Sequence, residues 1–109
     1  MNRERHGKRW TESEMSAALD AYLGMLNAQE KGTEVRPDQV IERLLGSTLA
    51  GRTHEAVRRR FCNITSLFAD RGWPQVDGFN RLSHVGANQE QVLLSLLSER
   101  GFPHNDTPS

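Results

Sequence analysis

Arginine is concentrated in one short stretch of the sequence, and arginine suits the binding of phosphate and guanine. Residues 52–60 hold four arginines against one acidic residue, Glu55. A guanidinium can donate two parallel hydrogen bonds to a guanine edge, or it can hold a phosphate. Thr53 and the free amides of a helix start could hold a phosphate oxygen. Asn63 could read adenine, and His54 could touch a phosphate. This stretch therefore predicts a nucleic-acid contact surface.

A second basic segment lies at the start of the sequence. Residues 1–9 carry four basic residues against Glu4, and we expect them to form a flexible basic arm that reaches along a nucleic-acid backbone or into a minor groove. The chain as a whole has no net charge, with 14 basic and 14 acidic residues, which counts against a strongly basic binder. Residues 11–30, however, contain acidic residues and no basic one. Such segregation allows a basic face on a neutral protein.

The candidate contact residues come from these two basic segments and from one later loop. The predicted nucleic-acid contacts are Arg5, Lys8, Arg9, Arg52, Thr53, His54, Arg58, Arg59, Arg60 and Asn63. The candidate recognition loop contributes Trp73, Phe79, Asn80 and Arg81.

Each of these candidates also has an ordinary structural interpretation. Arg58–Arg60 could be only a solvated helix face, and Asn63 could bond locally to the backbone. Packing is favoured over base stacking for Trp73 and Phe79. Trp10 is expected to belong to the core.

Helix signals position the first two elements. Thr11 and Glu14 form a capping-box pattern, and apolar residues then recur at helical spacing, so a helix is predicted over about 12–28. Pro37 suits a first helical turn and Gly46 a helix end, which predicts a second helix over about 37–46.

The arginine-rich stretch belongs to the third predicted helix, over about 53–69, with Thr53 as its cap. Val57, Phe61, Ile64 and Phe68 share one face and should be buried, whereas Arg59, Asn63 and Ser66 point away from that face. A last helix over about 89–99 is predicted from a cap at Asn88 and a stop at Gly101.

The predicted fold class is all-α, with a trihelical helix-turn-helix core, an irregular glycine-rich segment over 71–87 and a C-terminal helix. We expect one domain over 10–101 and a disordered tail or linker start over 102–109. The turn before the arginine-rich helix is typical of proteins that place their last helix in the major groove.

Several function classes find no support in the sequence. A single cysteine, Cys62, allows no intrachain disulfide and suits a reducing cytoplasm. The sequence contains no zinc-like ligand spacing, no nucleophilic triad, no phosphate-cradling loop and no apolar run that would span a membrane or serve as a signal peptide. We therefore expect a cytoplasmic, non-catalytic protein without metal or cofactor.

Longer patterns carry a resemblance to a known family. Arg9-Trp10-Thr11-x-x-Glu14, followed by Gly51-Arg52-Thr53-x-x-x-Val57-Arg58-x-Arg60, resembles the Myb/SANT pattern. Together with Ala21-Tyr22-Leu23, Leu49-Ala50, Asn63-Ile64, Gly72-Trp73-Pro74-x-Val76-x-Gly78-Phe79 and Val85-Gly86, it is similar to an N-terminal domain of bacterial restriction-type proteins, especially HNH endonucleases and McrB-like systems. The resemblance covers roughly residues 9–97.

The resemblance implies a DNA-targeting module in a bacterial or phage restriction or defence context. Its partners would be DNA, expected to be double-stranded, and a nuclease or NTPase domain on the same or another chain. Relatives favour Gly-Tyr-x-Pro where this chain has Gly78-Phe79-Asn80-Arg81, so the loop is expected to recognise something different here. The alternative function is protein interaction, either through the acidic first helix or by self-association through the leucines of the last helix.

Overall fold

The computed structural model describes residues 9–82 and 87–102, and this part of the chain is built from helices without strands. The helices are α1 (Glu12–Glu30), α2 (Pro37–Leu45), α3 (His54–Asp70) and α4 (Ala87–Glu99). The all-α fold class is therefore confirmed, and each predicted helix is found with its ends shifted by at most two residues. None of these helices is long and apolar enough to cross a membrane.

The start of α1 is fixed by the predicted capping box. The Thr11 backbone amide donates to Glu14 Oε1 at 2.8 Å, and the Glu14 amide donates to Thr11 Oγ1 at 3.1 Å. These two bonds satisfy backbone donors that have no partner inside the helix. From there α1 presents one long apolar face, which includes the fully buried Leu19 and Tyr22.

The short helix α2 and the turn after it bring the chain to α3. Pro37 occupies the first turn of α2, and Gly46 caps its end as predicted. The turn buries Leu49 completely and bends at Gly51, whose φ of 93° favours glycine. Thr53 then caps α3 by accepting a hydrogen bond from the Ala56 amide at 3.0 Å.

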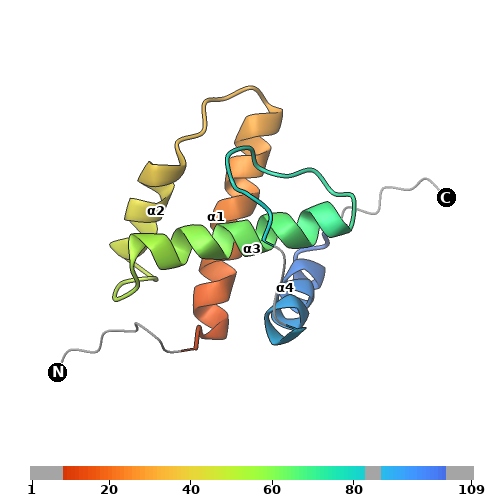
Figure 1. Cartoon of the computed structure of the whole chain (residues 1–109). Helices are drawn as coiled ribbons and strands as arrows, with labels where there is room; N and C mark the ends of the chain where they lie inside the picture. Colours follow the sequence, from red (N-terminus) through yellow and green to blue (C-terminus); the bar gives the residue numbers. More distant parts are fainter. Residues whose placement is uncertain (1–8, 83–86, 103–109) are drawn as a thin grey trace.

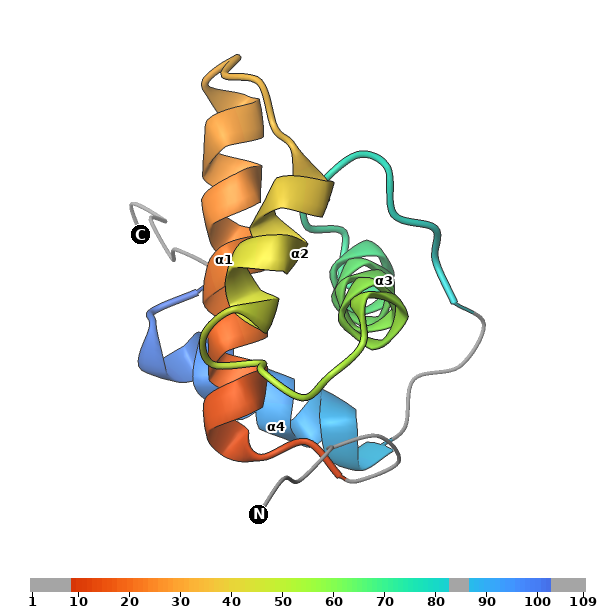
Figure 2. The ribbon, with the colours of Figure 1, turned by 90° about the vertical axis from the view of Figure 1, so that its left-hand side faces the viewer.

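Helix α3 lies at the centre of the molecule and crosses α1 (Figure 1). Viewed along α3, α1 and α2 lie on one side and residues 71–82 on the other (Figure 2). The predicted buried face is confirmed, because Val57, Phe61, Ile64 and Phe68 are all 0% exposed.

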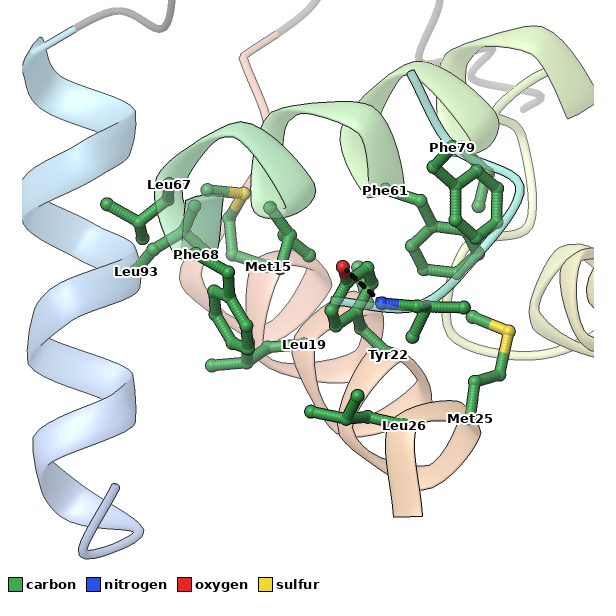
Figure 3. Packing of buried hydrophobic residues seen from close by; sticks show 14 of the residues in the cluster. Met15, Leu19, Tyr22, Met25, Leu26, Phe61, Leu67, Phe68, Phe79 and Leu93 are labelled. Atoms are coloured by element: carbon green, nitrogen blue, oxygen red, sulfur yellow. Dashed lines mark hydrogen bonds between the residues drawn. The ribbon is translucent and has the colours of Figure 1, made fainter. Parts of the chain in front are cut away.

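Residues 71–82 have no regular structure but are firmly attached to the helices. Val76 and Phe79 are buried, and the Val76 amide donates to the Tyr22 hydroxyl at 3.0 Å (Figure 3). The side chain of Gln29 accepts from the Asp77 amide at 2.8 Å and donates to the Gln75 carbonyl at 2.9 Å. The predicted packing of this irregular segment onto the helices is therefore confirmed for 71–82, whereas residues 83–86 lie outside the described part of the chain.

Helix α4 closes the core next to α1 and α3. Its residues Leu93, Leu96 and Leu97 are buried, and Leu93 faces Leu67 of α3 (Figure 3). The helix begins at Ala87, so Asn88 lies inside its first turn, and the prediction of Asn88 as the cap was wrong. Gly101, at φ 69°, follows the end of α4 as expected.

Candidate nucleic-acid interface

Arg52 belongs to a buried ion pair. Its Nη2 and Nε donate to the two carboxylate oxygens of Glu14 at 2.8 and 3.0 Å, and Nη2 also donates to the Arg9 carbonyl at 3.1 Å. The side chains of Arg52 and Glu14 are only 4% and 2% exposed. This corrects the expectation that Arg52 contacts a nucleic acid, because its guanidinium is already used to join the start of α1 to the start of α3.

Arg60 packs on Trp10 rather than projecting from α3. Its guanidinium carbon lies 4.4 Å from the centre of the Trp10 ring, and that of Arg52 lies 5.1 Å from the same ring. Within the described residues, Arg60 Nε and Nη1 are buried without a hydrogen-bond partner. Burial, and secondly the charge of Arg52, lowers the pKa of Arg60 to about 10. Arg60 is therefore a poor candidate for a direct contact, and Trp10 is partly buried beneath it.

The outer face of the C-terminal half of α3 is covered. Asn63 is 7% exposed and its Nδ2 donates to Gln89 Oε1 of α4 at 3.1 Å. Ser66 is 1% exposed and exchanges hydrogen bonds with the Leu82 backbone, donating to the carbonyl at 3.2 Å and accepting from the amide at 2.6 Å. Asn63 and Ser66 do lie away from the apolar face of α3, as predicted, but they are covered by α4 and by Leu82 and are not accessible to a nucleic acid. The partner of Asn63 is a distant side chain rather than the local backbone.

The outer side of the first two turns of α3 remains exposed. Arg58 and Arg59 are both accessible to solvent, and within the described residues neither forms an ion pair with an acidic side chain. Arg58 donates from Nη2 to the Gly78 carbonyl at 3.3 Å, and its guanidinium carbon lies 5.3 Å from the centre of the Phe79 ring. Two neighbouring cations thus remain available on this part of the helix.

Three other predicted contacts lie close to this exposed part of α3. Thr53 is exposed, but its hydroxyl is used as the helix cap. His54 Nε2 lies 3.6 Å from Asp38 Oδ1 of α2, and the histidine side chain is 45% exposed. Arg9 is exposed, and its carbonyl accepts from Arg52. Arg5 and Lys8 lie outside the described residues.

The aromatic residues of the candidate recognition loop are packing residues. Phe79 is 7% exposed, and its ring centre lies 5.3 Å from that of Phe61. Trp73 is partly buried and makes edge contacts with Phe68 and Phe102, at ring-centre distances of 5.3 and 5.2 Å. Their favoured interpretation as packing residues is confirmed, because these contacts leave the rings little surface for stacking on a base.

Ion pairs neutralise the arginines that follow α3. Arg81 is exposed, but its Nη2 lies 2.5 Å from Asp70 Oδ1, and Arg71 pairs with Glu90 at 3.0 Å. Asn80 is exposed. Of the basic residues on α3 and the following segment, Arg58 and Arg59 are thus the exposed ones without an ion pair in the described part of the chain.

Comparison with known proteins leaves the arrangement to be judged on its own geometry. No protein-family model, no curated protein sequence and no solved structure matches the chain. Across residues 9–82 and 87–102, no group of three or more histidine, cysteine or acidic side chains is placed to hold a metal ion.

Proposed function

We propose that this chain is a DNA-binding module whose contact surface is the first two turns of α3 together with Arg9. The observation that carries the proposal is the pair Arg58 and Arg59, which are adjacent, exposed and without an ion pair in the described residues. Exposed arginines without a carboxylate partner favour phosphate and base contacts. The pairing of Arg52, Arg71 and Arg81 with acidic residues concentrates the available charge at this place.

The shape of the molecule supports a contact through one end of α3. The accessible side of the helix runs along residues 54–62. This length is about 13 Å at 1.5 Å per residue, close to the roughly 12 Å width of a major groove. The other half of α3 is covered by α4 and by residues 79–82. In the helix-turn-helix binding mode that we propose, α3 would enter the groove with its N-terminal end, and α2 would lie beside the DNA backbone.

The wider context is part of the same proposal. The ligand is double-stranded DNA, and the chain acts in the cytoplasm as a non-catalytic targeting module of a bacterial or phage restriction or defence system. A nuclease or NTPase domain, on the same or another chain, supplies the catalysis. The motif resemblance supports this context, whereas the exposed arginines support only the binding of DNA.

The direct test is a fluorescence-anisotropy titration with a labelled 20-base-pair duplex at several salt concentrations. Log affinity is expected to fall linearly with log salt, by about 0.9 for each phosphate neutralised. Arg58→Ala and Arg59→Ala should each weaken binding, and loss of a phosphate contact should reduce the steepness of that line by about one. Lys31→Ala, at an exposed basic residue just after the end of α1, is the control and should change affinity much less.

Binding that ignores salt, or that survives loss of both Arg58 and Arg59, would contradict the proposal. Using an unmodified and a cytosine-modified duplex in parallel also shows whether the module distinguishes modified DNA.

The alternative function is protein interaction, and several residues expected to form its docking surfaces are buried or paired in the structure. Glu14, expected on an acidic docking face, is buried against Arg52, and Asp20 of the same helix pairs with Arg100 at 2.7 Å. Leu93, Leu96 and Leu97 of α4 are 0–3% exposed, so of the leucines on this helix only the partly buried Leu94 retains surface for self-association. No contact in the described residues favours this second function.

A further inference from the structure

Arg58 is an exposed residue that is nevertheless held in place. One face of its guanidinium lies over the Phe79 ring at 5.3 Å, and its Nη2 donates to the Gly78 carbonyl at 3.3 Å. The neighbouring Arg59 is also exposed, but its side chain makes no hydrogen bond or ion pair within the described residues. The two arginines therefore differ in the contacts that hold their side chains in place.

The support beneath Arg58 is itself fixed to the core. Phe79 is 7% exposed and packs against Phe61 and Tyr22, at ring-centre distances of 5.3 and 6.4 Å (Figure 3). The backbone just before it is held by two hydrogen bonds. The Val76 amide donates to the Tyr22 hydroxyl, and the Asp77 amide donates to the Gln29 side chain. A guanidinium resting on this surface loses little additional freedom when it binds a ligand.

We propose that Phe79 is a positioning residue that holds Arg58 as a pre-placed clamp for a phosphodiester oxygen of duplex DNA. This inference rests on the proposed function. Because a ring covers one face of the guanidinium and a carbonyl occupies Nη2, Arg58 would lose both contacts if it extended toward base edges. A phosphate at the flank of α3 can be bound without that movement. Residues 78–79 thus belong to the interface although the Phe79 ring is buried.

A double-mutant cycle on affinity for a labelled random-sequence 20-base-pair duplex tests this role. Phe79→Leu keeps an apolar side chain in the core but removes the ring beneath Arg58. It should weaken binding about two- to fivefold, the value of an exposed cation–π contact. Arg58→Ala should weaken binding about tenfold, and adding Phe79→Leu to it should cost little more. In contrast, the effects of Phe79→Leu and Arg59→Ala on affinity should multiply, as expected for independent changes.

The outcomes separate the inference from the proposed function. A wild-type chain that binds no duplex overturns both. The inference alone is overturned if the wild-type chain binds but the effects of Phe79→Leu and Arg58→Ala on affinity multiply, as those of Phe79→Leu and Arg59→Ala do. Thermal unfolding of each variant shows whether it is folded. A merely structural role for Phe79 would reduce the effects of Arg58→Ala and of Arg59→Ala on affinity alike.

A second measurement covers the case in which Phe79→Leu fails to fold. Arg58→Lys leaves Phe79 and the charge in place but removes the planar stack, so it should weaken binding about two- to fivefold with an unchanged salt slope. In the free wild-type protein, ¹⁵N relaxation should show Arg58 Nε more ordered than Arg59 Nε. Equal mobility of the two side chains, or full affinity in Arg58→Lys, would overturn the inference.

Discussion

Charged side chains that look alike in the sequence have different positions in the molecule. Arg52 forms an ion pair with Glu14, and Arg60 packs on Trp10. Arg58 and Arg59, in contrast, remain exposed. The residues that carry the Myb/SANT resemblance at the start of the chain, Trp10 and Glu14, thus form one packing cluster with Arg52 and Arg60. That part of the pattern therefore indicates how the helices are joined rather than what they bind.

The Glu14–Arg52 pair should make a large contribution to the free energy of unfolding. Glu14→Gln can keep the capping hydrogen bonds but leaves the Arg52 charge buried without its counterion, and such a loss typically costs about 3–5 kcal/mol. Urea denaturation measures the change. Glu12→Gln, in the same helical turn but exposed, should stay within about 0.5 kcal/mol of wild type. A cost below about 1 kcal/mol for Glu14→Gln would show that the pair is not important for stability.

At the scale of elements, local signals predicted where helices begin, and packing decided the rest. The caps at Thr11 and Thr53 and the proline at the start of α2 are all found in the structure. These signals act within a single turn of helix, so the sequence alone was sufficient. The cap assigned to Asn88 failed because the helix continues one residue upstream, to Ala87.

The covered half of α3 could not be predicted from its own sequence. A helical wheel identifies one apolar face and assigns the opposite face to solvent. Asn63 and Ser66 lie on that opposite face but bond to Gln89 and Leu82, which come from elements much later in the chain. Small polar residues bond equally well to water or to a distant partner. Only the tertiary arrangement decides between these partners, and with it which candidate contacts are accessible.

Tyr22 joins three elements, and its ionisation should make the fold sensitive to alkaline pH. Its hydroxyl on α1 bonds to Thr65 of α3 at 2.7 Å and to the Val76 amide. Burial raises the pKa of Tyr22 above its ordinary value of 10.0, and the two hydrogen bonds partly offset this. The stabilisation that follows is present below pH 10 and is lost as the pH rises through the raised pKa of the folded state.

Urea unfolding between pH 7 and pH 11 measures this dependence. Tyr22→Phe should lower the free energy of unfolding at pH 7 by about 1–3 kcal/mol, because the Val76 amide loses its partner. The free energy of unfolding of this variant should also fall less at alkaline pH, because the variant has no phenol to ionise. The lowered pKa of Arg60 acts in the opposite direction in both proteins, so the difference between their pH profiles isolates Tyr22. Parallel profiles would contradict this assignment.

At the scale of the whole molecule, α4 completes the core that the first three helices leave open. Its residues Leu93, Leu96 and Leu97 are almost fully buried, and burying three leucines contributes roughly 5–9 kcal/mol. This is comparable to the whole free energy of unfolding of a small domain, about 5–15 kcal/mol. A chain that ends at Leu82 should therefore lose cooperative thermal unfolding, as followed by circular dichroism.

Single substitutions on α4 test the same point without shortening the chain. Leu93→Ala should lower the free energy of unfolding by about 2–5 kcal/mol, whereas Ser95→Ala, at an exposed position of the same helix, should leave it nearly unchanged. A chain ending at Leu82 that melts as sharply as the 109-residue chain would show that α1–α3 are stable without α4.

The division of α3 into an accessible first part and an enclosed second part also sets its tolerance to sequence change. Substitutions at exposed positions such as 55, 58 and 59 alter the surface while leaving the side chains that hold the fold in place. Substitutions from Phe61 to Phe68 mostly affect buried side chains. The exposed positions in the first part of α3 can therefore be randomised in a library with most members still folded, provided that the buried Val57 is kept, and new binding preferences can be selected there on an unchanged scaffold.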